Sequence, residues 1–189
     1  IVTTVSRSPI SDTAHISADL RSPDAISAVM NSIVERHGGV DIVVNAMGVV
    51  AFGTVDATSI DTIEELFLTN TFAHIFLMKE ALKCARQGSV LVGISGVIAE
   101  QNLPGLATYG ASKVAVRSFN EALTREARRS GIRVIDARPP HTETGLSSRA
   151  IAGDPPKFPV GLDPTKVAQR IVRAIADGET DLPSAAFAS

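Results

Sequence analysis

The sequence is poor in aromatic residues, which make up 4% of its 189 positions, and it contains no tryptophan and a single cysteine. Cys84 cannot form a disulfide within the chain and has no companion for a metal site, so we predict no metal, a packing or surface position for this thiol and a reducing, cytoplasmic environment. No apolar run is long enough to cross a bilayer, which argues against a membrane protein. The formal net charge of −2 gives no electrostatic reason to expect nucleic acid as a partner.

An initiator methionine is also missing, because the chain opens with Ile1 and Val2 inside a β-branched run. This beginning suggests a fragment, a processed product or a sequence whose first part is absent. The length still fits one domain with a substantial core, and we find no internal repeat or linker that would divide it. We therefore predict a single domain over residues 1–189.

Apolar periodicity alternates between strand and helix types along the chain. We expect 60–85 to form two consecutive helices that meet near Asn70, 141–162 to form a mobile loop, and 182–187 to add a last short strand. This alternation predicts an α/β fold, a Rossmann-type doubly wound parallel sheet with helices on both faces and its working loops at the carboxyl ends of the strands. The other strand patterns cover 1–5, 40–45, 88–95 and 132–137, and the other helical patterns cover 24–36, 108–129 and 164–176.

One pair of residues has a spacing suited to acid–base chemistry. Tyr109 and Lys113 are four positions apart in a predicted helix, so their side chains lie on one face. A phenol has a pKa near ~10, too high for proton transfer at neutral pH, and a neighbouring cation lowers it. The alternative is an ordinary helical pair without chemistry. The context favours a functional pair, because the helix follows a buried strand ending at Ser95, whose hydroxyl can hold a substrate oxygen.

With two further motifs, this arrangement resembles the short-chain dehydrogenase/reductase family. The segment 41–48, Asp-Ile-Val-Val-Asn-Ala-Met-Gly, is similar to the strand-and-turn motif of that family, and Asn70 matches its helix asparagine. The resemblance covers nearly the whole chain and implies an oxidoreductase. In it, Tyr109 is the general acid in reduction, and Lys113 lowers the pKa of the phenol and holds the nicotinamide ribose. The resemblance further implies that Ser95 orients the carbonyl and that Asn70 completes a proton relay through water.

The end of the first strand bears on the choice of cofactor. In the family an acidic residue there favours NAD, since it accepts from both ribose hydroxyls and repels a 2′-phosphate. This chain instead has Ser6 and Arg7, and a guanidinium can form charge-assisted hydrogen bonds to that phosphate. The alternative is a solvated loop arginine. We therefore expect NADP(H) to be preferred and NAD(H) to remain possible.

The resemblance implies further cofactor contacts, which follow the ends of the predicted strands. One aspartate matches the residue that accepts from the adenine amino group, and small residues after 40–45 let the backbone pass beneath the adenosine ribose. A threonine-rich turn after 132–137 reaches the nicotinamide and its carboxamide or the pyrophosphate, and His141 in that turn is either a substrate contact or a plain loop histidine. The residues assigned to the cofactor in this way are Asp19, Leu20, Asn45, Ala46, Gly48, Pro139, Thr142 and Thr144, in addition to Ser6, Arg7, Tyr109 and Lys113.

Two features depart from the family pattern. The family begins with a strand and a glycine-rich turn that cradle the pyrophosphate, whereas residue 1 here already corresponds to the second strand. That first strand would lie in the middle of the sheet, so we expect the native protein to have it; a domain-swapped or partner-supplied strand is the alternative. The family serine usually lies thirteen residues before the tyrosine, which falls on Gly96, whereas Ser95 lies fourteen before it. We favour Ser95, with one residue inserted in the loop; Gly96 would leave the site without this donor.

More than one function is compatible with these residues. The leading prediction is an NADP(H)-dependent reductase or dehydrogenase that acts on a small, largely apolar ketone or alcohol. A non-catalytic dinucleotide-sensing or scaffolding relative is the rival, and a dehydratase or epimerase would use the same tyrosine and lysine. The resemblance also implies a homodimer or homotetramer that packs through the helices at 70–85 and 108–129.

Overall fold

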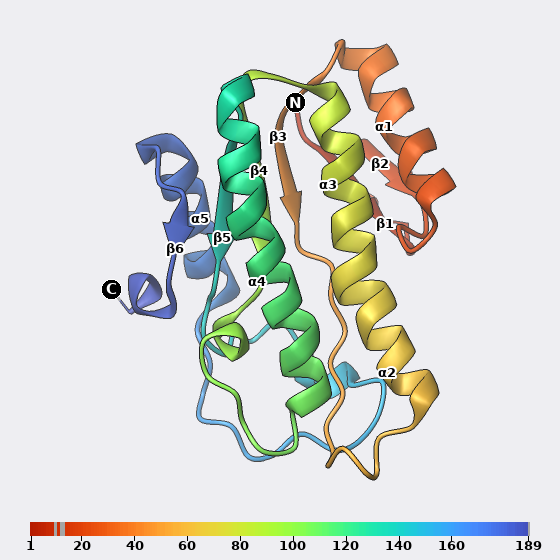
Figure 1. Ribbon diagram of the computed structural model, residues 1–189, viewed down its shortest axis with the longest axis vertical. Coiled ribbons are helices and arrows are strands. Elements are labelled where there is room, and N and C mark those ends of the chain that lie inside the picture. Colours follow the sequence, from red (N-terminus) through yellow and green to blue (C-terminus); the bar gives the residue numbers. More distant parts are fainter. Residues whose placement is uncertain (10, 12–13, 189) are drawn as a thin grey trace.

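Strands and helices alternate along the chain, and every pair of neighbouring strands is parallel (Figure 1). The computed structural model describes residues 1–9, 11 and 14–188. The strands are β1 (Thr3–Ser6), β2 (Ala14–Ser17), β3 (Val40–Asn45), β4 (Ala85–Ile94), β5 (Arg133–Ala137) and β6 (Asp181–Leu182). The helices are α1 (Pro23–His37), α2 (Ile60–Leu66), α3 (Ala73–Cys84), α4 (Ala107–Ala127) and α5 (Pro164–Asp177), and a π-helical segment (Phe67–Phe72) joins α2 to α3.

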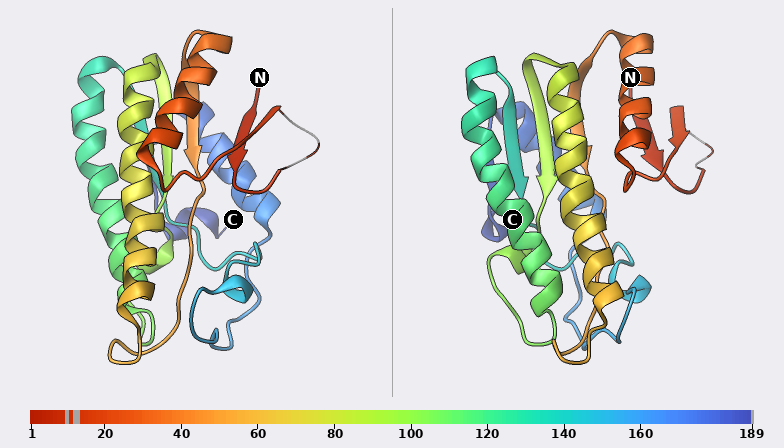
Figure 2. Two further views of the ribbon diagram at one scale, coloured as in Figure 1. Left: turned by 90° about the vertical axis from the view of Figure 1, so that its right-hand side faces the viewer. Right: turned by 45° about the vertical axis from the view of Figure 1, so that its right-hand side comes forward.

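Hydrogen bonds divide the strands into two groups. β1 pairs with β2, and the other strands form a sheet of order β3-β4-β5-β6. Within the described ranges no backbone hydrogen bond joins β1 to β3, although the two groups lie next to each other (Figure 2). Two apolar side chains of β3 are consequently uncovered, since Ile42 is 52% and Val44 47% exposed. The separation lies where the resemblance to the family places a further strand, which we expect the native protein to have.

Helices cover the larger sheet on both faces, as a doubly wound sheet requires (Figures 1 and 2). On one face α1, α3 and α4 bury a core that includes Ile26, Met78 and Leu91. On the other face α5 packs Ile171 and neighbouring residues against Val92 and its partners in the sheet. Side chains of a strand alternate between the two faces, so odd-numbered residues of β4 point towards α3 and α4. This alternation decides which polar residues at the strand ends meet.

Local signals define the ends of the helices. The Ser22 hydroxyl accepts from the amide of Ala25 at the start of α1, and the Asp163 carboxylate accepts from Thr165 and Lys166 at the start of α5. α1 ends at Gly38, which has a φ of 75°. The predicted boundaries of both helices are therefore confirmed to within about two residues, the usual uncertainty of helix ends.

The structure corrects several predictions. The segment 60–84 holds two consecutive helices as predicted, α2 and α3, and the π-helical segment that contains Asn70 joins them without a break. β2 lies outside the predicted strands, since its sequence Ala-His-Ile-Ser has too little apolar character. The 182–187 tail forms only the end of a two-residue strand and a short 3₁₀ turn. The 141–162 loop is hydrogen-bonded to the segment after β3: the amide of Ile151 donates to the carbonyl of Val50, and the amide of Phe52 donates to the carbonyl of Ala152.

Candidate active site

The predicted site residues gather at one edge of the molecule, where the parallel strands end. Ser6 closes β1, Asn45 closes β3, and Ser95 and Pro139 follow β4 and β5 within two residues. Tyr109 lies in the first turn of α4, and Asn70 lies in the π-helical segment. Residues far apart in the sequence therefore converge because carboxyl ends of parallel strands share one edge.

Tyr109 and Lys113 lie one turn apart on α4, in agreement with their spacing. Burial raises the pKa of Tyr109 to about 12 and lowers the pKa of Lys113 to about 8, the latter against the opposing charge of Asp136. The Lys113 ammonium donates to the carbonyl of Ile94 at 2.9 Å. The expected lowering of the phenol pKa by Lys113 is absent from this arrangement, in which burial alone determines the shift at Tyr109.

Asn70 joins the segment after β3 to α4. Its side-chain amide donates to the carbonyl of Val49 at 3.0 Å and to the Ser112 hydroxyl at 2.9 Å, and its oxygen accepts from the amide of Val49 at 2.8 Å. Gly48 lies against this group, since a Cβ there would be 3.4 Å from Asn70 Oδ1 and 3.5 Å from Lys113 Nζ. The structure thus brings together Gly48, Asn70 and Lys113.

Ser95 does not face the tyrosine side of the site. Its side chain is fully buried, and its hydroxyl donates to Asp136 at 3.0 Å. Gly96, thirteen residues before Tyr109, has φ 85° and ψ 163°, a backbone conformation that is essentially restricted to glycine. A Cβ on Gly96 would meet no atom within 4 Å. Position 96 therefore has open space around it and no hydroxyl.

The residues predicted to bind the adenosine half lie at the ends of β1 and β2. Arg7 is exposed and forms no hydrogen bond through its side chain with any described residue, whereas the Ser6 hydroxyl donates to the carbonyl of Ser8. Asp19 is held by Arg21 in an ion pair of 2.6 Å, and this contact is the main reason that its pKa falls to about 2. Leu20 is buried in the core. Adenine would have to share the Asp19 carboxylate with Arg21.

The turn after β5 that contains Thr142 and Thr144 is the start of the 141–162 loop. The Thr142 hydroxyl donates to the carbonyl of Pro140 at 2.8 Å, and Thr144 is exposed, with its amide directed to the carbonyl of Thr142. The ring of His141 stacks on Phe158, with ring centroids 4.8 Å apart. Phe158 in turn packs on the apolar group around Tyr109, which also includes Val50, Phe52, Ile98, Leu106, Leu146 and Ala150.

The sequence analysis does not predict a set of buried, hydrogen-bonded polar side chains that lies below the ends of the strands. Asn45, Gly93 and Asp136 are in register on β3, β4 and β5, and the side chains of His74 and Asn120 lie over Gly93. Hydrogen bonds run from Asn45 to His74 (2.8 Å), from His74 to Asn120 (2.7 Å) and from Asn120 to Asp136 (2.8 Å). We call the four polar residues the buried polar row. The only sequence signal is the glycine inside an apolar strand, which marks close approach by other atoms.

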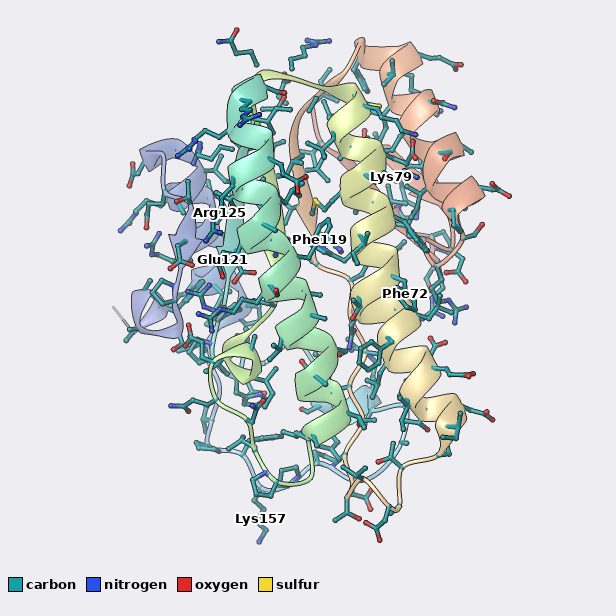
Figure 3. All side chains as sticks on the ribbon, viewed as in Figure 1. Phe72, Lys79, Phe119, Glu121, Arg125 and Lys157 are labelled. Carbon is teal, nitrogen blue, oxygen red and sulfur yellow. The ribbon has the colours of Figure 1, made fainter. Side chains whose placement is uncertain are left out.

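The tautomer of His74 follows from its partners. The Asn45 oxygen accepts from the amide of Met47, so its NH2 group faces Nδ1 of His74, which must be unprotonated. The proton then lies on Nε2 and is donated to Asn120. Burial lowers the pKa of His74 to about 4, which keeps the ring neutral at physiological pH. Phe119, labelled in Figure 3 between α3 and α4, covers this ring edge-on with centroids 5.6 Å apart.

Comparison with known proteins agrees with the fold and the order of these motifs. Residues 3–154 match the family model described as short chain dehydrogenase. The chain therefore belongs to the short-chain dehydrogenase/reductase family. It is 31% identical over 179 residues to the dehydrogenase/reductase SDR family protein 7-like of Anopheles gambiae, covering 90% of this chain and 56% of that protein. It is 32% identical over 177 residues to the dehydrogenase/reductase SDR family member 7B of Bos taurus, covering 88% and 54%.

Solved structures show the same fold. The alcohol dehydrogenase of the archaeon Thermococcus sibiricus, complexed with 5-hydroxy-NADP, has a TM-score of 0.75 at 20% identity, covering 89% of this chain and 70% of that one. The chain spans about half the length of the curated relatives named above. Among the helices of the described residues, none combines the length and apolar character needed to cross a membrane.

Proposed function

We propose that the protein is an NADP(H)-dependent oxidoreductase that reduces a carbonyl or oxidises an alcohol, with Tyr109 as the proton donor or acceptor. The observation that carries this proposal is the meeting of Lys113 with Asn70 and Gly48 at the carboxyl edge of the sheet, with Tyr109 one turn before the lysine on α4. A tyrosine whose hydroxyl has no hydrogen-bond partner in the described residues, beside a buried lysine, is available for proton transfer to a bound oxygen.

The residues present fit a nicotinamide cofactor. Gly48 leaves a cradle next to Lys113 Nζ and Asn70 Oδ1, which a side chain would fill. We propose that Asn45, Ala46 and Gly48 lie along the adenosine ribose and that Lys113 binds the nicotinamide ribose. On the other side of the nicotinamide we place Pro139, Thr142 and Thr144. When bound, NADPH supplies the hydride that reduces the carbonyl carbon.

The protein would supply the proton and its replacement. Tyr109 would give its phenolic proton to the substrate oxygen when the carbonyl is reduced, which would leave an alcohol and a phenolate. The Lys113 ammonium stabilises that phenolate and then gives it a proton, and we propose that a water held by Asn70 returns a proton to the lysine. Ser95 can orient the substrate carbonyl, the role proposed for it, only if its hydrogen bond to Asp136 breaks. That bond holds the hydroxyl inside the core.

A Tyr109→Phe substitution tests the catalytic proposal. Without the phenolic proton, oxidation of NADPH by a small apolar ketone such as acetophenone should fall by about 10²–10⁴-fold. The Kd for NADPH, followed by cofactor fluorescence, should change little, because the aromatic ring stays in place. A variant that retains full turnover would exclude Tyr109 as the proton donor.

We also propose a preference for NADP(H) that depends on Arg7. Its exposed guanidinium has no hydrogen-bonding partner within the described residues and lies at the end of β1, where the adenosine ribose is expected. Arg7→Ala should weaken NADPH binding about tenfold or more and leave NADH binding nearly unchanged, since only the former carries the 2′-phosphate. Arg129→Ala, which removes an exposed arginine in the 3₁₀ turn after α4, is the matched control. Equal losses for both cofactors would contradict the assignment.

The rival function, a non-catalytic dinucleotide-binding protein, is favoured by one observation. Gly96 has no hydroxyl at the position thirteen residues before Tyr109, and Ser95 is turned into the core. Such a protein would bind NADPH and show no turnover, and Tyr109→Phe would then change nothing. The two variants above, measured for binding and for turnover, separate the two functions.

We propose an apolar substrate, because Tyr109 packs with an apolar group that includes Val50, Phe52 and Leu106. A hollow of about 180 Å³ beside Phe52 and Leu106 is also lined by Gly105, Asp154 and Pro156. The size and lining suit a small ketone or alcohol without a fixed charge. Reduction of acetophenone but not of a keto acid of similar size is the expected result.

We propose a homodimer or homotetramer that packs through α3 and α4. An apolar side chain is exposed at each helix: Phe72, labelled in Figure 3, is 47% exposed at the end of the π-helical segment just before α3, and Val114 on α4 is 40% exposed. A groove of about 610 Å³ adjoins Phe72, lined also by Ile63, Phe67 and Leu68. Phe72→Glu should shift the mass measured by light scattering towards the monomer.

A further inference from the structure

One carboxylate lies within the core directly below the residues assigned to proton transfer. Asp136 is 6% exposed and closes the buried polar row on β5. Its Oδ2 accepts from the Ser95 hydroxyl at 3.0 Å, and Ser95 follows Ile94, whose carbonyl accepts from Lys113 Nζ at 2.9 Å. We infer that Asp136 is a positioning residue that keeps Lys113 charged and directed along the end of β4. The inference rests on the proposed function only for what Lys113 does.

Asp136 acts on Lys113 without touching it. Asn120 donates to its Oδ1 and Ser95 to its Oδ2, so both oxygens are engaged and the carboxylate is fixed in place. The lysine, 6% exposed, forms no ion pair with any acidic side chain in the described part of the chain. In a poorly polarisable interior a charge acts over several ångströms, which makes Asp136 the main electrostatic support of the ammonium. The pKa of Lys113, lowered by burial to about 8, is held up by this carboxylate.

The neighbouring cation neutralises the negative charge of Asp136 only in part. Arg138 pairs with it at 2.5 Å, but the same guanidinium also pairs with Glu100 at 2.5 Å and with Asp181 at 2.7 Å. Three carboxylates thus share one cation. Their charge raises the pKa of Arg138 although burial opposes it, so this arginine stays protonated. His74, on the other side, is neutral and does not compensate Asp136.

The architecture around Asp136 explains why β4 has a glycine at position 93. A Cβ there would overlap Nδ2 of Asn120 and lie 2.7 Å from Cε1 of His74. Without it, the two side chains span the strand and connect Asp136 to Asn45, whose oxygen holds the amide of Met47 in the turn assigned to the cofactor. One row of hydrogen bonds therefore positions both the cofactor turn and the carboxylate below Lys113.

Lysine side-chain NMR tests this inference directly. The chain has five lysines, so carbon-labelled lysine gives few signals, and Lys113→Met identifies the buried one. Asp136→Asn should lower the titration midpoint of Lys113 by about one pH unit, because the neutral amide no longer favours the ammonium. Asp181→Asn is the matched control: it removes a carboxylate from the same arginine at an exposed position, 63% accessible, and should leave the midpoint unchanged.

The outcomes separate the inference from the proposed function. A lower midpoint in Asp136→Asn alone supports the inference, whether or not the protein turns over a substrate. An unchanged midpoint in a folded Asp136→Asn variant, or equal shifts in both variants, overturns it. In an active enzyme the alkaline limb of the pH profile of kcat/KM should move to lower pH with the midpoint.

A measurement on the unsubstituted protein covers the case in which Asp136→Asn does not fold. The carboxyl carbon signal of Asp136 should show a step at the pH at which Lys113 titrates, and that of Asp181 should not. The absence of the step at Asp136 would also overturn the inference.

Discussion

The buried imidazole of His74 makes a quantitative prediction about stability and pH. Its pKa falls from 6.5 to about 4 on folding, mainly through burial, so the folded protein binds this proton less readily than the unfolded chain. The stabilisation is therefore fully present above pH ~6.5 and is lost as the pH falls towards ~4. The pKa difference corresponds to about 3 kcal/mol of the free energy of unfolding, with a slope of up to about 1.4 kcal/mol per pH unit.

His74 resists protonation for a structural reason as well, because two hydrogen-bond donors would then face each other. A proton on Nδ1 of His74 would face the NH2 group of Asn45, whose orientation is fixed by the Met47 amide. Protonation therefore breaks the buried polar row as well as placing a charge in the core.

Urea unfolding between pH 7 and pH 5 measures the effect before most carboxylates titrate. The free energy of unfolding should fall by about 2 kcal/mol over this range, and His74→Gln, whose amide can accept from Asn45 and donate to Asn120, should remove most of that dependence. His37→Gln, at an exposed position at the end of α1, is the control and should keep it. The same pH dependence in wild type and His74→Gln would refute the reasoning.

Three further substitutions follow from the backbone and the helix ends. Gly93→Ala should lower the free energy of unfolding by about 1–3 kcal/mol, because its methyl group overlaps Asn120, and denaturant unfolding measures this. Gly96→Ser should cost about 1–3 kcal/mol, since φ 85° and ψ 163° suit glycine alone, and should raise turnover if the missing hydroxyl limits it; a neutral effect on stability would contradict the backbone assignment. Asp163→Ala should cost about 1 kcal/mol by removing the acceptor for Thr165 and Lys166, with no effect on NADPH binding.

The sequence alone supports the fold class and the placement of Tyr109 and Lys113, the pair to which we propose a catalytic role. Strand and helix periods differ, so the apolar spacing indicates β3, β4, β5, α1, α4 and α5, with ends that agree to within about three residues. The helical period by itself also places Tyr109 and Lys113 on one face of α4. Short or polar elements such as β2 leave no such signal, because their place is decided by the partner strand.

The direction of a side chain at the end of a strand is a tertiary property. Counting residues cannot decide between Ser95 and Gly96, whereas the structure shows the Ser95 hydroxyl bound to Asp136 and Gly96 in a conformation reserved for glycine. In the same way, Arg21 occupies the carboxylate of Asp19, which the family resemblance assigns to adenine.

Periodicity therefore determined which residues form strands and helices and which face of α4 carries the tyrosine and lysine, since both depend on neighbours along the chain. The buried polar row was decided only by the tertiary structure. Asn45, His74, Asn120 and Asp136 come from four elements, and their hydrogen bonds exist because parallel strands in register align three positions while two helices close over a glycine. No local pattern encodes such a meeting, because each of these residues is individually compatible with an exposed position.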